Sequence, residues 1–233
     1  MWSGPRNIST AMMYAFGNRA DFTCWDEPFY AFSLVHHGND HPMREAIIAG
    51  NEHDFEKLVS RSLAPAATPH FYQKHMTHHM LPGYDRRWIL GLSNAFLIRD
   101  PARVLESYVK KWADVGLRDI GFVEQAEIFD MVAERLGRAP PVVDAEDILA
   151  DPRSVLAKLC AGLGIGFDAA MLDWPAGPKP FDGNWAPHWY EAVWKSTGFA
   201  RPKSKEPELP PALRKISDQA RPYYERMRAF RLA

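Results

Sequence analysis

The stretch Ser3-Gly4-Pro5-Arg6-Asn7-Ile8-Ser9-Thr10 constrains the fold of this chain most strongly. Met1 and Trp2 indicate a short strand before it, and an apolar run over residues 11–16 follows and ends at Gly17. A strand, a tight turn and a helix N-terminus form the geometry that binds phosphate, because the first N–H groups of a helix have no partner within it. The sequence therefore predicts an anion site at this turn.

Three side chains of the stretch strengthen that prediction. Arg6 carries a forked guanidinium suited to phosphate or sulfate, and Ser9 and Thr10 add two hydroxyl donors at the helix start. The stretch lacks the second Gly and the Lys of the pattern G-x-x-x-x-G-K-[ST], so it is not a Walker P-loop. The alternative is an ordinary strand-to-helix turn that happens to be rich in Ser and Thr.

Composition bounds the class of protein. The chain has 233 residues, of which 46% are hydrophobic and 24% charged, which suits a single domain spanning residues 1–233. A net charge of −1 disfavours nucleic acid and membrane surfaces as partners. Cys24 and Cys160 make neither a disulfide framework nor a zinc site. With no signal peptide and no long apolar span in the sequence, we expect a cytoplasmic protein.

Strand-like and helix-like segments alternate, which favours a parallel sheet with helical crossovers. Strands are expected at 22–25, 69–76, 94–98 and 142–143 in addition to the first strand; that one is unusually short, unless the coding sequence starts upstream of Met1. Helices are expected at 54–63, from Pro101 onward with Asp100 as N-cap, at 123–136, at 155–163 and at 211–230.

Residues 174–204 have a different character, because they are rich in Trp and Pro. We interpret them as a loop-rich arm with aromatic anchors, of the kind that folds over ligands. Candidate cofactor contacts in the arm are Lys179, Gly183, Asn184 and Trp185.

Two acids, Asp26 and Glu27, follow the strand at 22–25, at the edge where open α/β sheets bind ligands. Asp26 is a candidate N-cap for a helix that starts at Pro28, which leaves Glu27 as the freer carboxylate. The histidines between residues 36 and 53 are His36, His37, His41 and His53. Their spacing matches no metal-binding pattern, and we interpret them as surface loop residues.

Lys74, His75, His78 and His79 crowd the end of the strand at 69–76. Histidine is the natural general base near neutral pH, and a lysine there could neutralise a leaving phosphate. We expect one of the histidines to act; the alternative is a polar connection to the loop at 81–83.

Arg99 ends the strand at 94–98, and Ser107 lies on the flank of the apolar face of the next helix, about two turns into it. Together they could hold one anion.

These segments resemble the sulfotransferase family. Residues 3–10 resemble its 5′-phosphosulfate loop, with Asn7-Ile8 in place of the usual Ser-Gly, and residues 98–108 resemble its 3′-phosphate segment. Residues 144–152 and 163–165 are similar to two later family motifs, and 74–79 fall where the family often has K-T-H-L-P. Residues 25–30 and 189–199 resemble a branch linked to aminotransferase-like proteins.

The resemblance implies a three-layer, P-loop-type α/β fold with a central parallel sheet of about five strands. It implies that 3′-phosphoadenosine 5′-phosphosulfate donates a sulfuryl group to a hydroxyl or amine of a small acceptor, without a metal. The donor contacts would be Gly4, Pro5, Arg6, Asn7, Ser9, Thr10, Arg99, Ser107 and Trp185. The catalytic candidates would be Arg6, Glu27, Lys74, His75 and His79, with His78 as a further possible base.

Two other functions stay open from the sequence. One is a kinase-like or nucleotide-hydrolysing P-loop protein, which the missing Walker lysine disfavours. The other is a binding module that has kept the nucleotide site and lost the chemistry.

Overall fold

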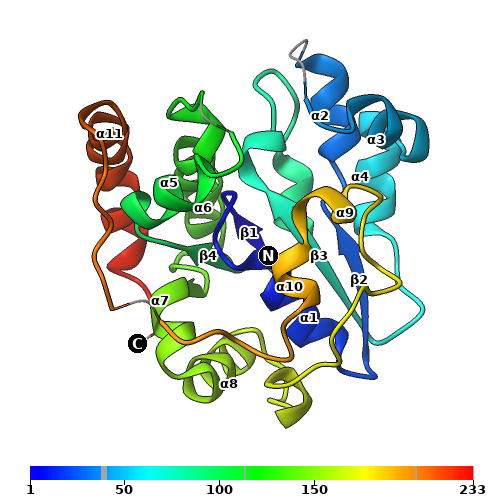
Figure 1. Cartoon of the computed structure of the whole chain (residues 1–233). Coiled ribbons are helices and arrows are strands. Elements are labelled where there is room, and N and C mark those ends of the chain that lie inside the picture. Colours follow the sequence, from blue (N-terminus) through cyan, green and yellow to red (C-terminus); the bar gives the residue numbers. More distant parts are fainter. Residues whose placement is uncertain (38–40, 113, 203, 233) are drawn as a thin grey trace.

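A five-stranded parallel sheet with the strand order β2-β3-β1-β4-β5 forms the centre of the molecule (Figure 1). The computed structural model describes residues 1–37, 41–112, 114–202 and 204–232. The strands are β1 (Trp2–Ser3), β2 (Phe22–Asp26), β3 (His70–Met76), β4 (Phe96–Ile98) and β5 (Val142–Asp144). The predicted sheet is confirmed, and the central strand β1 has two residues, as expected.

Helices connect the strands. In chain order they are α1 (Ser9–Gly17), α2 (Tyr30–His36), α3 (Arg44–Gly50), α4 (Phe55–Leu63), α5 (Pro101–Tyr108), α6 (Phe122–Leu136), α7 (Ala145–Ala150), α8 (Pro152–Gly162), α9 (Ala186–Trp189), α10 (Glu191–Trp194) and α11 (Pro211–Arg228). Single 3₁₀ turns lie at Thr77–His79, Arg87–Gly91, Arg118–Ile120 and Ala169–Met171.

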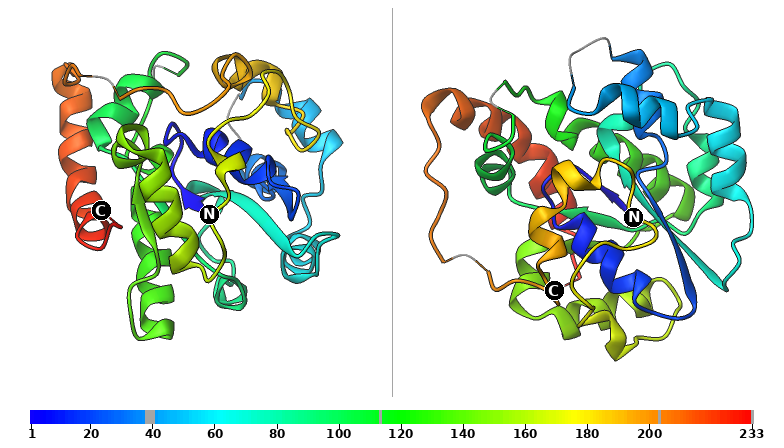
Figure 2. Two further views of the ribbon diagram at one scale, coloured as in Figure 1. Left: turned by 90° about the horizontal axis from the view of Figure 1, so that it is seen from below. Right: turned by 45° about the vertical axis from the view of Figure 1, so that its right-hand side comes forward.

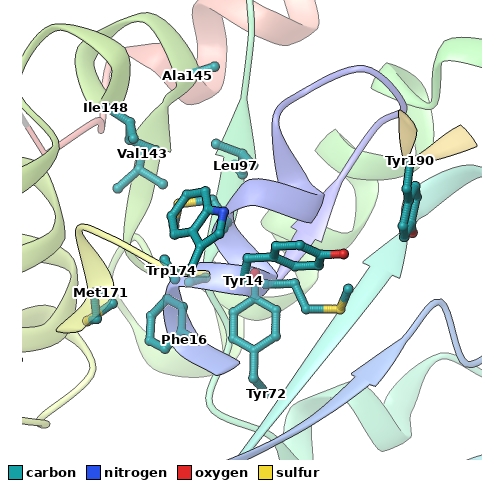
Figure 3. Close-up of a cluster of buried hydrophobic side chains, with 14 of the residues drawn as sticks. Tyr14, Phe16, Tyr72, Leu97, Val143, Ala145, Ile148, Met171, Trp174 and Tyr190 are labelled. Atoms are coloured by element: carbon teal, nitrogen blue, oxygen red, sulfur yellow. The ribbon is translucent and has the colours of Figure 1, made fainter. Parts of the chain in front are cut away.

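Strand side chains alternate between two hydrophobic clusters, which places helices on both faces of the sheet. Leu97 and Val143 point into the cluster that includes residues of α1, α7 and α8 (Figure 3). Phe96 and Ile98 point into the other cluster, with residues of α5, α6 and α11. Figure 2 shows α11 standing beside α5 and α6. The predicted three-layer arrangement is therefore confirmed.

Capping side chains explain several helix starts. Asp54 accepts a hydrogen bond from the Lys57 N–H at 3.0 Å, and Asp100 accepts one from the Ala102 N–H at 2.8 Å. The predicted Asp100 cap is thus confirmed. The predicted Asp26 cap is wrong: the helix that follows begins at Tyr30, because the Asp26 carboxylate is buried among other partners.

The described part of the arm, residues 174–202, crosses β2 and β3 in the view of Figure 1 and contains the short helices α9 and α10. Buried rings anchor it, since Trp174 and Trp185 are 3% and 2% exposed. Asp182 adds a polar anchor, because it accepts hydrogen bonds from the Tyr14 hydroxyl at 2.7 Å and from Trp194 Nε1 at 2.9 Å. The terminal helix expected at 211–230 ends at Arg228.

Candidate functional site

A cavity of about 730 Å³ lies where the chain leaves β1, β2, β3 and β4. The phosphate-loop candidates Pro5, Arg6, Asn7, Ser9 and Thr10 line it, together with residues that follow the other three strands and with residues of the arm. Ligands of open α/β sheets bind at this edge, outside the carboxyl ends of the strands.

The loop before α1 has an unusual backbone. Arg6 and Ile8 have φ angles of 61° and 57°, in the left-handed region that favours glycine. Ile8 stands where the family resemblance expects a glycine, so this β-branched residue holds a strained conformation. Gly4 packs behind the loop: a Cβ there would lie 2.4 Å from the Ile120 carbonyl oxygen.

Arg6, Arg99 and Ser107 meet at one side of the cavity, and we call them the arginine wall. Arg6 Nε donates to Ser107 Oγ at 2.9 Å, and Arg99 Nη1 donates to the Arg6 carbonyl at 2.9 Å. Burial, together with the neighbouring Arg99, lowers the pKa of the Arg6 guanidinium. Two guanidinium groups and a hydroxyl therefore converge, as expected of an anion site.

One carboxylate balances part of this charge. Arg99 Nη2 lies 3.1 Å from Glu146 Oε1, and the Arg103 guanidinium lies 3.7 Å from the other oxygen of the same carboxylate. Arg6 makes no ion pair among the interactions recorded for the described residues. No carboxylate of the described residues therefore balances the positive charge of Arg6.

A second charged cluster, the lysine network of Asp26, Glu27, Lys74 and Tyr190, lies at the ends of β2 and β3. Lys74 Nζ donates to Asp26 Oδ1 at 2.9 Å, to Glu27 Oε1 at 2.6 Å and to the Tyr190 hydroxyl at 2.7 Å. The Tyr190 hydroxyl in turn donates to Asp26 Oδ2 at 2.7 Å. All three donor positions of this ammonium group are therefore taken.

The lysine network changes the proton affinity of its members. Burial lowers the pKa of Lys74, but the two carboxylates outweigh it, so the net shift is upward and Lys74 is charged. Burial raises the pKa of Glu27, and Asp26 adds to this rise, while Lys74 opposes it. Glu27 lines the cavity, as Lys74 and Tyr190 do.

His78 and His79 line the cavity beside the lysine network. Burial lowers the pKa of His78 to about 3 and that of His79 well below its usual range, so both rings are neutral at pH 7. The Nδ1 atoms of both have no hydrogen-bond partner among the described residues. His79 stacks on Tyr30, with ring centroids 4.8 Å apart.

Three of the sequence candidates lie away from the cavity lining. His75 stacks on Trp2 at 4.3 Å, and its Nε2 lies 3.1 Å from Gln73 Oε1. Trp185 is buried and donates to the Tyr190 hydroxyl at 3.3 Å, and Gly4 packs against Ile120. The other arm candidates Lys179, Gly183 and Asn184 also lie outside the lining.

Sequence reasoning missed Tyr190 as a site residue and interpreted His37 and His41 as surface loop residues, whereas all three line the cavity. His41 lies beside Tyr30, another residue of the cavity lining, and its Nε2 atom is 3.1 Å from the Tyr30 hydroxyl. Tyr190 is 116 residues from Lys74 in the chain, and no spacing rule connects the two. The aromatic content of the arm was the one available signal.

The described residues offer neither a metal-binding cluster nor a membrane-spanning helix. Across 1–37, 41–112, 114–202 and 204–232, no group of three or more His, Cys, Asp or Glu side chains could hold a metal ion. None of the helices in that part of the chain is long and apolar enough to cross a membrane.

Solved structures similar to this chain include two sulfotransferase domains. The domain from the curacin biosynthetic pathway is 17% identical, with a TM-score of 0.52, over 94% of this chain and 95% of that one. The domain from the Synechococcus PCC 7002 olefin synthase is also 17% identical, with a TM-score of 0.49, over 94% and 92%. The first of these likenesses supports the fold.

Two curated relatives from Arabidopsis thaliana are named branched-chain-amino-acid aminotransferase-like proteins 2 and 1. Both are 35% identical to this chain, over 228 and 229 residues. The matches cover 97% and 98% of this chain but 40% and 41% of the relatives, so the chain spans about two fifths of their length. A family model described as a sulfotransferase domain matches residues 1–231. Because that model spans nearly the whole chain, this protein belongs to the sulfotransferase domain family.

Proposed function

We propose that this chain transfers a sulfuryl group from 3′-phosphoadenosine 5′-phosphosulfate to a hydroxyl or amine of a small acceptor. The observation that carries the proposal is the arginine wall. Arg6 Nε lies 2.9 Å from Ser107 Oγ, although these two residues are 101 positions apart in the chain. Family membership supports the reaction class.

The residues at this side of the cavity fit the donor. Arg6, Ser9, Thr10 and the first amides of α1 would hold the 5′ end, because a helix N-terminus and a guanidinium both favour anions. Arg99 and Ser107 would hold the 3′-phosphate. This second phosphate separates the donor from ATP, which lacks it.

The donor supplies an activated sulfuryl group that can move in line to the acceptor. Alignment and charge stabilisation then provide most of the catalysis, as in phosphoryl transfer. Arg6 and the α1 amides offset the negative charge on the departing phosphate. Lys74 is a weaker candidate for this role, since its three donor positions are taken within the lysine network.

Glu27 is the best candidate for the residue that removes the acceptor proton. Its side chain lines the cavity, and burial raises its pKa from the ordinary carboxyl range. His79 and His78 also line the cavity, but burial lowers the pKa of both and makes them poorer bases. His75 lies in the core, away from the lining.

A thermal-shift experiment tests the donor site. The product 3′,5′-adenosine bisphosphate, at 100 times its Kd, should raise Tm by about 5 to 10 °C, whereas ATP with Mg²⁺ should not. Arg99→Ala should abolish the shift. Arg103→Ala is the matched control, because Arg103 shares Glu146 with Arg99 but does not line the cavity. Stabilisation by Mg-ATP alone would refute the proposal.

Turnover of the donor with a panel of hydroxyl and amine acceptors tests the chemistry. Glu27→Gln should lower kcat by at least about 100-fold, because general-base catalysis contributes roughly that much or more. The same variant should keep the bisphosphate shift. Wild-type activity in Glu27→Gln would exclude Glu27 as the base.

A further inference from the structure

The lysine network contains more charge than a simple ion pair needs. Lys74 and Asp26 are 1% and 3% exposed and already form a balanced pair at 2.9 Å. Glu27 adds a second carboxylate at 2.6 Å from the same ammonium group. The Glu27 side chain is only 11% exposed, and a carboxylate beyond charge balance in such a place costs stability, so its presence points to a role in the reaction.

Backbone geometry supports that interpretation. Glu27 has a φ angle of 37°, in the left-handed region that a residue with a side chain rarely adopts. Strain of this kind persists where the surroundings hold the residue in place, and it gathers at functional sites. Here the Lys74 ammonium group holds the side chain, and the Tyr30 backbone N–H donates to the Glu27 carbonyl at 3.0 Å.

Tyr190 brings the arm into the same cluster. Its hydroxyl accepts from Lys74 Nζ at 2.7 Å and donates to Asp26 Oδ2 at 2.7 Å, and the Gly183 N–H donates to that oxygen at 3.2 Å. The phenol ring also lies over the ammonium group, with Nζ 5.1 Å from its centroid. Contacts from two points of the arm thus fix the position of Asp26 and, through it, of Lys74.

We propose that Asp26, Lys74 and Tyr190 are positioning residues that hold the Glu27 carboxylate as the proton acceptor, so that the seated arm forms part of the base site. This inference rests on the proposed function. In this inference Lys74 positions the Glu27 carboxylate, and it does not contact the leaving phosphate. It also gives the arm a second task besides covering the cavity.

Two substitutions should move the proton affinity of Glu27 in opposite directions. Asp26→Asn removes a neighbouring negative charge and leaves Lys74 to Glu27 alone, so the pKa of Glu27 should fall. Tyr190→Phe removes the hydroxyl that stabilises Asp26, and Lys74 is then drawn toward Asp26, so the pKa of Glu27 should rise. A purely structural role would lower stability without this divergence.

The first measurement is a carboxyl NMR titration of the whole chain with ¹³C-labelled glutamate. The Glu27 signal is assigned from its loss in Glu27→Gln. The expected result is a Glu27 titration at lower pH in Asp26→Asn and at higher pH in Tyr190→Phe. This readout needs no substrate, so it tests the positioning residues even if sulfuryl transfer is not observed.

The second measurement is the pH profile of kcat/KM with the sulfuryl donor. Its acid limb should follow the NMR titration, to lower pH in Asp26→Asn and to higher pH in Tyr190→Phe. At pH 7, Tyr190→Phe should lower kcat/KM by about tenfold, the usual effect of losing one hydrogen bond to a charged group.

Matched controls come from the other polar anchor of the arm. Tyr14→Phe and Asp182→Asn remove a partly buried tyrosine–aspartate hydrogen bond of the same length, 2.7 Å, and neither residue lines the cavity. Both controls should leave the Glu27 titration and the acid limb unchanged. The proposal is overturned if the two test variants bind the bisphosphate like the wild type and show an unchanged Glu27 titration. Failure of the bisphosphate to bind the wild type refutes the proposed function instead.

Discussion

The arginine wall and the lysine network lie on the same cavity but differ in how far carboxylates balance their positive charge. In the arginine wall, two guanidinium groups come together, and Glu146 balances Arg99. In the lysine network, one ammonium group meets two carboxylates and a phenol. The first cluster has cationic charge left for an anion, whereas the second has a surplus of negative charge.

This difference separates binding from proton transfer. Positive charge that is unbalanced in the protein without ligand lowers the free energy of unfolding. Binding of an anion restores that stability. Charge balanced within the protein adds no affinity, but it can fix the position and proton affinity of a neighbouring carboxylate. A cation at a strand end therefore says little about its role until its partners are known.

The largest expected effect is on folding. Lys74→Met removes the partner of two buried carboxylates, so the free energy of unfolding should fall by about 3–5 kcal/mol in urea titrations. Lys195→Met is the control, because Lys195 pairs with Glu191 at a similar distance of 2.7 Å but on the exposed surface. It should leave stability unchanged. Equal losses of stability in the two variants would show that the lysine network is no more important for folding than an exposed ion pair.

The second effect concerns binding and has the opposite sign for stability. Arg6→Gln removes a guanidinium whose burial beside Arg99 is unfavourable, so the Tm without ligand should stay the same or rise. The affinity for 3′,5′-adenosine bisphosphate, measured by calorimetry, should fall roughly 10- to 100-fold. A clear loss of Tm together with unchanged affinity would mean that Arg6 is a structural residue.

The smallest effect is a change in acid sensitivity at the end of β3. Burial lowers the pKa of His75 well below its usual range, whereas in the unfolded chain it titrates near 6.5. The stability that neutral His75 contributes is fully present above pH 6.5. It is lost as the pH falls below 6.5, because the unfolded state binds a proton that the folded state does not. Below pH 6.5 this costs about 1.4 kcal/mol per pH unit.

His75→Phe keeps an aromatic ring against Trp2 and removes the titration. Urea unfolding between pH 7.5 and 5 should therefore show a shallower loss of stability in the variant, by the amount that one proton accounts for. The same slope in both proteins would place the acid-sensitive group elsewhere.

Local patterns were enough to predict the sheet, because each strand carries its own signal. A continuous apolar run over residues 95–98 marked β4, and Asp100-Pro101 marked the start of α5. The error at Asp26 shows the limit of local reasoning. A carboxylate before a helix is a good cap in isolation, but here the Asp26 carboxylate pairs with Lys74, 48 residues further on in the chain.

Part of the cavity lining was predictable, where one motif carries several polar side chains. Arg6, Ser9 and Thr10 line the cavity, and so do Arg99 and Ser107 from the second motif. The histidines were harder to interpret, because neighbours in sequence point to different places: His75 lies in the core, while His79 lines the cavity. Strand alternation and the 3₁₀ turn after β3 decide between them.

The strand order has a consequence for how such a protein can diverge. Because β1 lies between β3 and β4, the loop that carries Arg6 has Arg99 and Ser107 on its β4 side and the lysine network on its β3 side. The two clusters share no residue, although their members alternate along the chain. Under the proposed function, mutations around β2, β3 and the arm can change proton transfer while the residues proposed to bind the nucleotide are inherited unchanged. A duplicated copy could thus become a sensor of the nucleotide through changes on one side of a single strand.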